Sequence, residues 1–154
     1  MLLRFKGLAV ESFQPYFAMS DDELAAHDVK RMVVDSKPGF PCRVTLEDAD
    51  PGERVLLLSF PHQPAHSPYK ASGPIFVRES ACKPFDGSEI PPVLRGRLLS
   101  LRAYDKTGMM VDADVIEGNE VEGLLERLFA RPDVENVHIH NARRGCFSCA
   151  VERV

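Results

Sequence analysis

The sequence predicts an α+β protein: a single domain with a mixed, mostly antiparallel sheet and two helices. Segments typical of strands, with alternating or continuously apolar residues, outnumber segments with helical periodicity. Turn residues separate several neighbouring strands by only a few positions, which favours antiparallel hairpins. The last third of the chain has two hairpin patterns on either side of one amphipathic helix, which predicts a C-terminal β-β-α-β-β unit.

The N-terminal segment is expected to contain one short helix between two strands. Residues 1–8 are predicted to form the first strand. Ser20 and Glu23 have the spacing of a capping box, so a helix should begin there and run to about Ala26. A strand over residues 31–35 is predicted to follow.

The middle of the chain is predicted to form a hairpin and then a long loop. Residues 42–47 alternate between apolar and polar, residues 55–60 are continuously apolar, and a cluster of turn residues joins them. Seven of the twelve prolines lie in the region 61–92, so a strand over 75–79 is the only regular element expected there. Long loops inside a compact domain are often functional, which makes this proline-rich loop a candidate site region.

The C-terminal third begins with a predicted hairpin. Strands over 98–104 and 109–116 flank a loop at 106–108, whose glycine suits the left-handed position of a three-residue turn. That turn sets a register in which apolar residues face each other and opposite charges meet: Leu99 with Val115, Leu101 with Ala113, and Arg102 with Asp112.

An amphipathic helix is predicted after this hairpin. Asn119 is expected to cap it, because Glu122 stands three residues later. Apolar residues then recur with helical spacing at Val121, Leu124, Leu125, Leu128 and Phe129. Pro132 ends the helix, which must cross over the sheet to reach the last two strands.

The last eighteen residues, 137–154, hold the highest density of reactive side chains in the chain. A turn at Arg143-Arg144-Gly145 predicts a hairpin. Its apolar face pairs Val137 with Val151, Ile139 with Cys149, and Asn141 with Phe147. Its polar face collects His138, His140, Cys146, Ser148, Ala150 and Glu152.

Cys146 and Cys149 are not expected to act together as a redox pair or a zinc knuckle. Residues three apart on a regular strand point to opposite faces, so the two thiols cannot meet. Cys149 and Cys42 are therefore expected to be small core residues, whereas Cys146 stands on the polar face.

His138 and His140 share that polar face, and Glu152 lies nearby across the ladder. This triad allows a metal site, but histidines on a solvent-facing strand need no function. No metal is therefore predicted, and the triad is the weaker alternative. Arg143 and Arg144 at the hairpin tip are either simply solvated or bind an anion.

The composition excludes several classes of protein. The chain has 154 residues, 44% of them hydrophobic, which is enough for one domain (1–154) without disulfides or a structural metal. A formal net charge of -4 argues against nucleic acid as a partner, and no apolar run approaches a membrane span. Charges at Arg4 and Lys6 would interrupt an export signal, so we expect a cytoplasmic protein with reduced thiols. No cofactor is predicted. The sequence does not determine an oligomeric state.

Several motifs carry a resemblance to a known family. They are Lys37-Pro-Gly-Phe-Pro-Cys-Arg43, Asp48-Ala-Asp-Pro-Gly-Glu53, His62-Gln-Pro64, Ser67-Pro-Tyr69, Ser72-Gly-Pro-Ile-Phe-Val-Arg-Glu79, and His138-Ile-His-Asn-Ala142 with Gly145-Cys146. Together they resemble the bacterial family called domain of unknown function 1203, from about Met32 to Arg153. The resemblance implies a full-length, single-domain bacterial protein, and it implies no activity, substrate or cofactor.

These motifs place distinctive polar residues in three blocks, which we expect to converge on one pocket at the sheet edge. Its predicted lining is His62, Tyr69, Ser72, Arg78, His140, Arg143 and Cys146, with His138 and Arg144 as further ligand-binding candidates. Arginine and hydroxyl groups suit a carboxylate or phosphate. The leading hypothesis is a binding or regulatory module for a small anionic molecule. An enzyme that uses Cys146 or His140 in the same pocket, and a protein-interaction module, are the alternatives.

Overall fold

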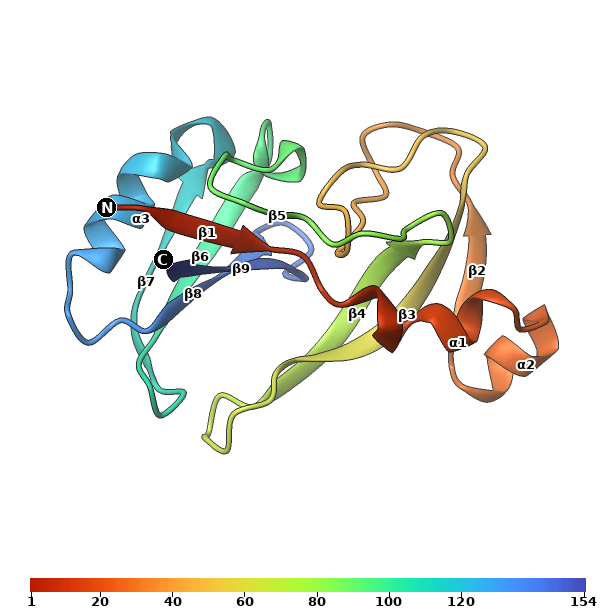
Figure 1. Cartoon of the computed structure of the whole chain (residues 1–154), viewed down its shortest axis with the longest axis horizontal. Coiled ribbons are helices and arrows are strands. Elements are labelled where there is room, and N and C mark those ends of the chain that lie inside the picture. The colour runs from red at the N-terminus through yellow and green to blue at the C-terminus, as the bar shows by residue number, and fades with distance from the viewer.

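The computed structural model describes residues 1–154 and shows an α+β fold with two antiparallel sheets (Figure 1). The larger sheet has the order β5-β1-β9-β8-β6-β7. Its strands are β1 (Leu3–Lys6), β5 (Asp86–Gly87), β6 (Leu98–Tyr104), β7 (Met110–Glu117), β8 (Asn136–Asn141) and β9 (Phe147–Arg153). The smaller sheet has the order β2-β3-β4, with β2 (Lys30–Val33), β3 (Arg54–Gln63) and β4 (Ala71–Arg78). The predicted α+β class is confirmed, but the strands are divided between two sheets instead of forming one mixed sheet.

Each sheet has its own helices and its own core. The helix α3 (Val121–Phe129) covers the six-stranded sheet, whereas α1 (Gln14–Phe17) and α2 (Asp21–Ala26) accompany the three-stranded sheet (Figure 1). Three short 3-10 helices complete the fold: η1 (Val10–Ser12), η2 (Pro92–Leu94) and η3 (Gly118–Glu120). All five apolar positions predicted for the amphipathic helix are buried in the larger core. Full burial of one such side chain contributes about 1.5–3 kcal/mol, so α3 is firmly held on its sheet.

The C-terminal β-β-α-β-β order is confirmed by the succession β6, β7, α3, β8, β9. The predicted cap of the first helix is also confirmed: the Ser20 Oγ accepts a hydrogen bond from the Glu23 backbone N–H at 3.1 Å, and α2 begins at Asp21. The predicted Asn119 cap is wrong. Asn119 lies inside η3, and the residue before α3 is Glu120, which makes no side-chain capping bond.

The predicted register of the β6–β7 hairpin is wrong by one residue. Leu101 lies opposite Asp114 and Arg102 opposite Ala113, because a bulge interrupts the ladder between Ala103 and Tyr104. The extra residue of a bulge shifts every pair beyond it by one position. The sequence shows the turn but not the bulge, so the turn alone gave a register that fails along the rest of the hairpin.

Residues 42–47 do not form the predicted strand. They make a tight turn in which the Cys42 N–H donates to the Glu47 carbonyl at 2.9 Å and Leu46 has a φ of 54°. Cys42 and Val44 belong to the core of the smaller sheet, and Leu46 belongs to the core of the larger one. The alternating pattern therefore belongs to a turn whose apolar side chains enter both cores. This segment connects the two sheets.

The proline-rich region contains more regular structure than predicted. β3 continues through Pro61 to Gln63, and β4 begins at Ala71, so the loop between them spans only residues 64–70. Pro74 is accepted because β4 is an edge strand, where a missing backbone N–H can face away from the ladder. β3 and β4 thus form a long hairpin that brings His62 toward the larger sheet.

Candidate functional site

The terminal hairpin β8–β9 faces the smaller sheet. Its loop covers residues 142–146, and Gly145 has a φ of +79°, a conformation that favours glycine. The predicted pairs of Val137 with Val151 and of Ile139 with Cys149 are confirmed. The predicted pair of Asn141 with Phe147 is wrong, because a bulge places Phe147 opposite His140. The bulge lets the Phe147 ring pack against the histidines.

The polar face of this hairpin is buried, which contradicts the interpretation of a solvent-facing strand. His138 is 8% exposed and His140 is 1% exposed. The rings of His62 and Phe147 stack at 5.5 Å with an interplanar angle of 6°, so the β3–β4 hairpin covers the face. The two histidines therefore lie between the sheets.

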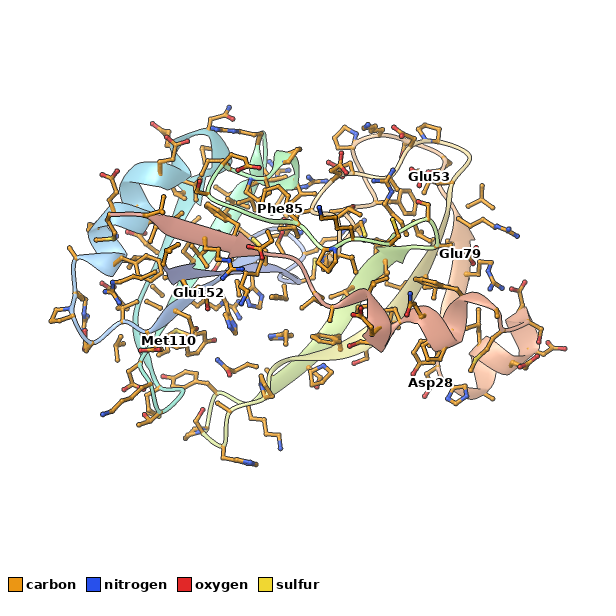
Figure 2. The ribbon with its side chains drawn as sticks, in the orientation of Figure 1. Asp28, Glu53, Glu79, Phe85, Met110 and Glu152 are labelled. Atoms are coloured by element: carbon orange, nitrogen blue, oxygen red, sulfur yellow. The ribbon has the colours of Figure 1, made fainter.

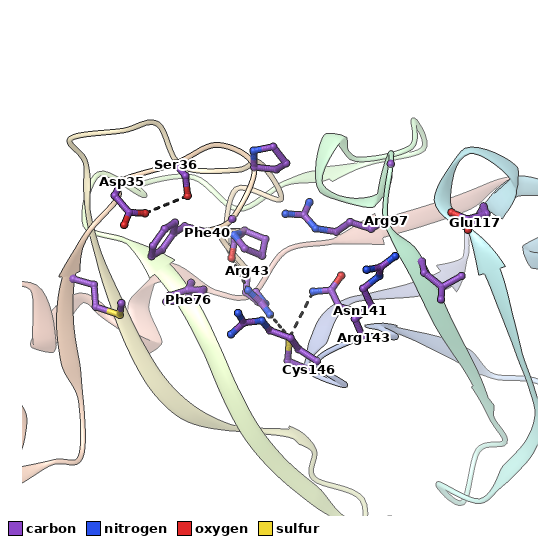
Figure 3. Close-up of a pocket in the computed structure, with 17 residues that line it drawn as sticks. Asp35, Ser36, Phe40, Arg43, Phe76, Arg97, Glu117, Asn141, Arg143 and Cys146 are labelled. Carbon is purple, nitrogen blue, oxygen red and sulfur yellow. Dashed lines mark hydrogen bonds between the residues drawn. The ribbon is translucent and has the colours of Figure 1, made fainter.

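A pocket of about 800 Å³ opens between the two sheets beside the turn of this hairpin (Figure 3). We call it the arginine pocket, because its lining includes Arg43, Arg97, Arg143 and Arg144. Phe40 and Phe76 line the side of the smaller sheet, and Asn141 and Cys146 line the side of the terminal hairpin. The pocket therefore combines apolar walls with several hydrogen-bond donors.

Arg43 is the most unusual of these residues, because it is only 2% exposed. Its side chain donates to the Phe147 carbonyl at 2.8 Å, to the Pro41 carbonyl at 2.6 Å and to the Cys146 Sγ at 3.1 Å. No carboxylate lies within ion-pair distance of it. Burial lowers the pKa of Arg43, with Cys146 acting in the opposite direction. A buried charge without an ionic partner is costly in free energy.

The backbone around Arg43 is fixed from both sides. Its N–H donates to the Phe76 carbonyl at 3.0 Å, and its carbonyl accepts from the Leu8 N–H at 2.8 Å. Gly7 allows this close approach, because a Cβ there would lie 2.0 Å from the Val44 carbonyl oxygen. The chain leaving β1 therefore holds the turn that presents Arg43.

The other arginines of the pocket differ in how their charge is balanced. Arg97 forms a bidentate pair with Asp48, at 2.6 and 3.0 Å, so its charge is already neutralised. Arg143 and Arg144 are exposed and have no ion-pair partner. Asp35 and Glu117 are the only carboxylates in the lining. With Arg97 neutralised by Asp48, three arginines against these two carboxylates leave the pocket wall with a net positive charge.

A second cluster consists of His62, His138 and His140, and we call it the histidine cluster. One potential ligand atom from each ring lies within 4.8 Å of the other two. Burial lowers the pKa of His138 and of His140 to about 4, and it lowers the pKa of His62 as well. All three imidazoles are therefore neutral at physiological pH, and they can accept hydrogen bonds or ligate metals.

The remaining predicted site residues lie outside both groups. Arg78 forms a bidentate pair with Glu53 at 2.6 and 2.9 Å, so its charge is satisfied, and it does not line the arginine pocket. Glu152 pairs with Lys6 at 3.2 Å, away from the histidines. Figure 2 shows Glu53 and Glu152 in opposite halves of the molecule.

Tyr69 and Ser72 are exposed residues near the tip of the β3–β4 hairpin. The Tyr69 ring meets the Tyr104 ring at 6.2 Å.

The expected single pocket is therefore divided. His62 and His140 do come together, at 5.0 Å between ring centroids, but only Arg143 and Cys146 of the predicted lining border the arginine pocket.

Sequence reasoning missed the burial of Arg43 and the position of Phe147. Arg43 lies in a motif of the family resemblance, but the alternation over residues 42–47 places it on the polar face of a predicted strand. Cys149 and Cys42 are core residues as predicted, with 1% and 0% exposure, and burial raises the pKa of Cys149 to about 12. All four cysteines are free.

The comparisons with known proteins give one match. The family model described as "Protein of unknown function (DUF1203)" matches residues 39–153. Neither the curated proteins nor the solved structures contain a match. The matched range includes the histidine cluster and the lining of the arginine pocket except Met32, Asp35, Ser36 and Pro38. No helix of the chain has the length and apolarity that a membrane crossing requires.

Proposed function

Since the chain belongs to the DUF1203 family, whose description names no reaction, we propose a function from the geometry: the protein binds a small anionic ligand in its arginine pocket. The ligand carries a carboxylate or a phosphate group. The volume of about 800 Å³ is within the range of pockets for small molecules. The open pocket suits a metabolite that enters and leaves.

The single observation that carries this proposal is the buried, unpaired charge of Arg43. Its three hydrogen bonds go to two backbone carbonyls and a sulfur atom. These contacts fix the orientation of the guanidinium but do not neutralise it. An anion beside Arg43 would supply the missing counter-charge, and a charge-assisted hydrogen bond in a partly desolvated site is worth about 1.5–3 kcal/mol.

The rim of the pocket supports the same ligand class. Arg143 and Arg144 extend from the hairpin turn without ionic partners, and the Asn141 amide lies beside Cys146. Phe40 and Phe76, whose rings are 5.0 Å apart, provide an apolar wall for the rest of the ligand. We further propose a cytoplasmic, bacterial setting, in line with four free thiols and the family resemblance.

Calorimetric titration with inorganic phosphate and with small mono- and dicarboxylates tests the proposal. The double variant Arg143→Gln/Arg144→Gln changes only exposed side chains, so it should fold normally. Loss of two cationic donors should weaken binding of the best anion by about tenfold or more. Arg127→Gln, an exposed arginine on α3, is the matched control and should bind as the unaltered protein does. Absence of binding across the panel, or equal losses in control and double variant, would refute the proposal.

A second candidate function is an enzyme that uses Cys146 as its nucleophile. The observation in its favour is that Arg43 and Asn141 both direct N–H groups at the Cys146 Sγ, at 3.1 and 3.6 Å. Such donors stabilise a sulfur atom that carries negative charge. The rate of alkylation by iodoacetamide at neutral pH distinguishes the two functions, with the exposed Cys82 as internal reference. Faster reaction at Cys146 than at Cys82 favours the enzyme, and slower reaction removes this candidate.

A further inference from the structure

The histidine cluster is a site in its own right, because no histidine lines the arginine pocket. We propose that His62, His138 and His140 bind one divalent transition-metal ion of the zinc type. The site would join the two sheets, since His62 lies on β3 and the other two ligands lie on β8. This inference is independent of anion binding in the arginine pocket.

The first argument is that each ring has an unsatisfied, buried nitrogen. The His62 Nδ1, the His138 Nδ1 and the His140 Nε2 are all buried without a hydrogen-bond partner. Buried polar atoms are almost always paired, and three unpaired nitrogens in one place need a common explanation. A metal ion would satisfy all three at once.

The second argument is the orientation of His140. Its Nδ1 lies 2.9 Å from the Gly145 carbonyl oxygen. A carbonyl only accepts hydrogen bonds, so the proton must be on Nδ1 and the lone pair on Nε2. Metal-binding histidines usually donate their second nitrogen to a carbonyl or carboxylate in this way. The hairpin turn therefore fixes the tautomer that leaves Nε2 ready to bind a metal.

The third argument is the size of the cluster. The three ligand atoms lie within 4.8 Å of one another. Zinc at about 2.0–2.1 Å from each nitrogen in tetrahedral geometry would separate neighbouring ligand atoms by roughly 3.4 Å. Small side-chain rotations that bring the ligand atoms closer by up to about 1.4 Å would complete the coordination. Packing against Phe147, whose ring meets all three imidazoles at 5.4–5.8 Å, keeps the rings close together.

The charges around the cluster indicate how the fourth position is filled. Three neutral imidazoles leave the ion's charge uncompensated. Arg102, on the neighbouring strand β6, lies directly opposite His138 in the ladder. A positive neighbour disfavours a bare cation and favours an anion on it. The fourth ligand is therefore an exchangeable anion, such as hydroxide or a carboxylate, as in three-histidine zinc sites with an open position.

Titration of metal-free protein with zinc chloride tests the site. Calorimetry should give one zinc per chain, and zinc at about a hundredfold over its Kd should raise the Tm by about 5 °C or more. His62→Gln removes the least buried ligand and should still fold. It should weaken zinc binding by more than about a hundredfold, because even changes outside the ligand shell cost about 10–100-fold. His138→Gln should have the same effect on affinity.

Matched controls separate this site from other zinc ligands. His66→Gln alters an exposed histidine of the same hairpin, and Cys146→Ser removes the nearest accessible thiol, so both variants should retain full zinc affinity. With cobalt in place of zinc, adding azide should shift the visible spectrum if the fourth position is open to anions. The proposal is overturned if the unaltered protein binds no stoichiometric zinc, if His62→Gln binds as tightly as it does, or if Cys146→Ser abolishes binding.

Discussion

The arginine pocket and the histidine cluster lie on the same hairpin yet have opposite chemistry. The pocket is open, and its unpaired arginines, Arg43 inside with Arg143 and Arg144 at the rim, outnumber its two carboxylates. The cluster is almost closed and consists of neutral rings packed on Phe147. One hairpin can support both, because its bulge and its turn direct neighbouring residues into different environments. Burial leaves the charge of Arg43 without a counter-ion in the arginine pocket, and it keeps the imidazoles of the histidine cluster neutral.

Phe147 is the residue that the two sites share, and its truncation should have the largest effect. Its carbonyl accepts from Arg43, and its ring packs on the histidines. Phe147→Ala keeps the carbonyl but removes the ring, and the strand can then shift into the vacated space. The free energy of unfolding should fall by about 3–5 kcal/mol, and both phosphate and zinc binding should weaken. Urea unfolding and the two titrations measure these effects.

Phe13→Ala is the matched control for this prediction. Phe13 is equally buried, but it packs with Phe60 in the core of the smaller sheet. Its truncation should cost a similar amount of stability and leave both ligands bound. If Phe147→Ala still binds phosphate and zinc with unaltered affinity, the Phe147 ring does not link the two sites.

The sequence predicts part of the fold around the two sites, and the rest depends on tertiary packing. The β-β-α-β-β unit, the core positions of α3 and the separation of Cys149 from Cys146 follow from periodicity alone. The bulge that turns Phe147 toward His140 does not, since it depends on how β8 and β9 fit against β3. The burial of Arg43 was equally hidden, because an alternating segment can be a half-exposed strand or a turn between two cores.

The next test uses Arg78, because Glu53 already neutralises the charge of this arginine. Glu53 accepts from Arg78, from Ser80 and from the Asp50 backbone, and these contacts hold the pKa of Glu53 at about 2, below its usual 4.5. The folded state therefore binds this proton less readily than the unfolded state does. The resulting stability is complete above pH 4.5 and is lost as the pH falls toward 2.

Glu53→Gln should accordingly cost roughly 1–2 kcal/mol at pH 7, after allowance for solvent screening, and almost nothing near pH 2. Urea unfolding at several pH values measures the difference. Phosphate affinity should not change, since Arg78 lies outside the arginine pocket. A loss of phosphate binding in this variant would mean that the pocket extends to Arg78.

The smallest expected effect comes from Asp48, which neutralises Arg97 at the edge of the arginine pocket. Asp48→Asn keeps a hydrogen-bond acceptor but releases the charge of Arg97. Phosphate should then bind several-fold more tightly at low ionic strength, on the order of 1 kcal/mol. Zinc binding should be unaltered. Tighter zinc binding would indicate that the two sites share one electrostatic environment.

The most direct test of two separate sites on one hairpin is a crossed titration. Phosphate and zinc are titrated separately into Arg143→Gln/Arg144→Gln and into His62→Gln. The arginine variant should lose at least about tenfold in phosphate affinity and bind zinc normally, whereas His62→Gln should lose zinc and bind phosphate normally. Loss of both ligands in either variant would contradict the account, because it would mean that the residues form a single site.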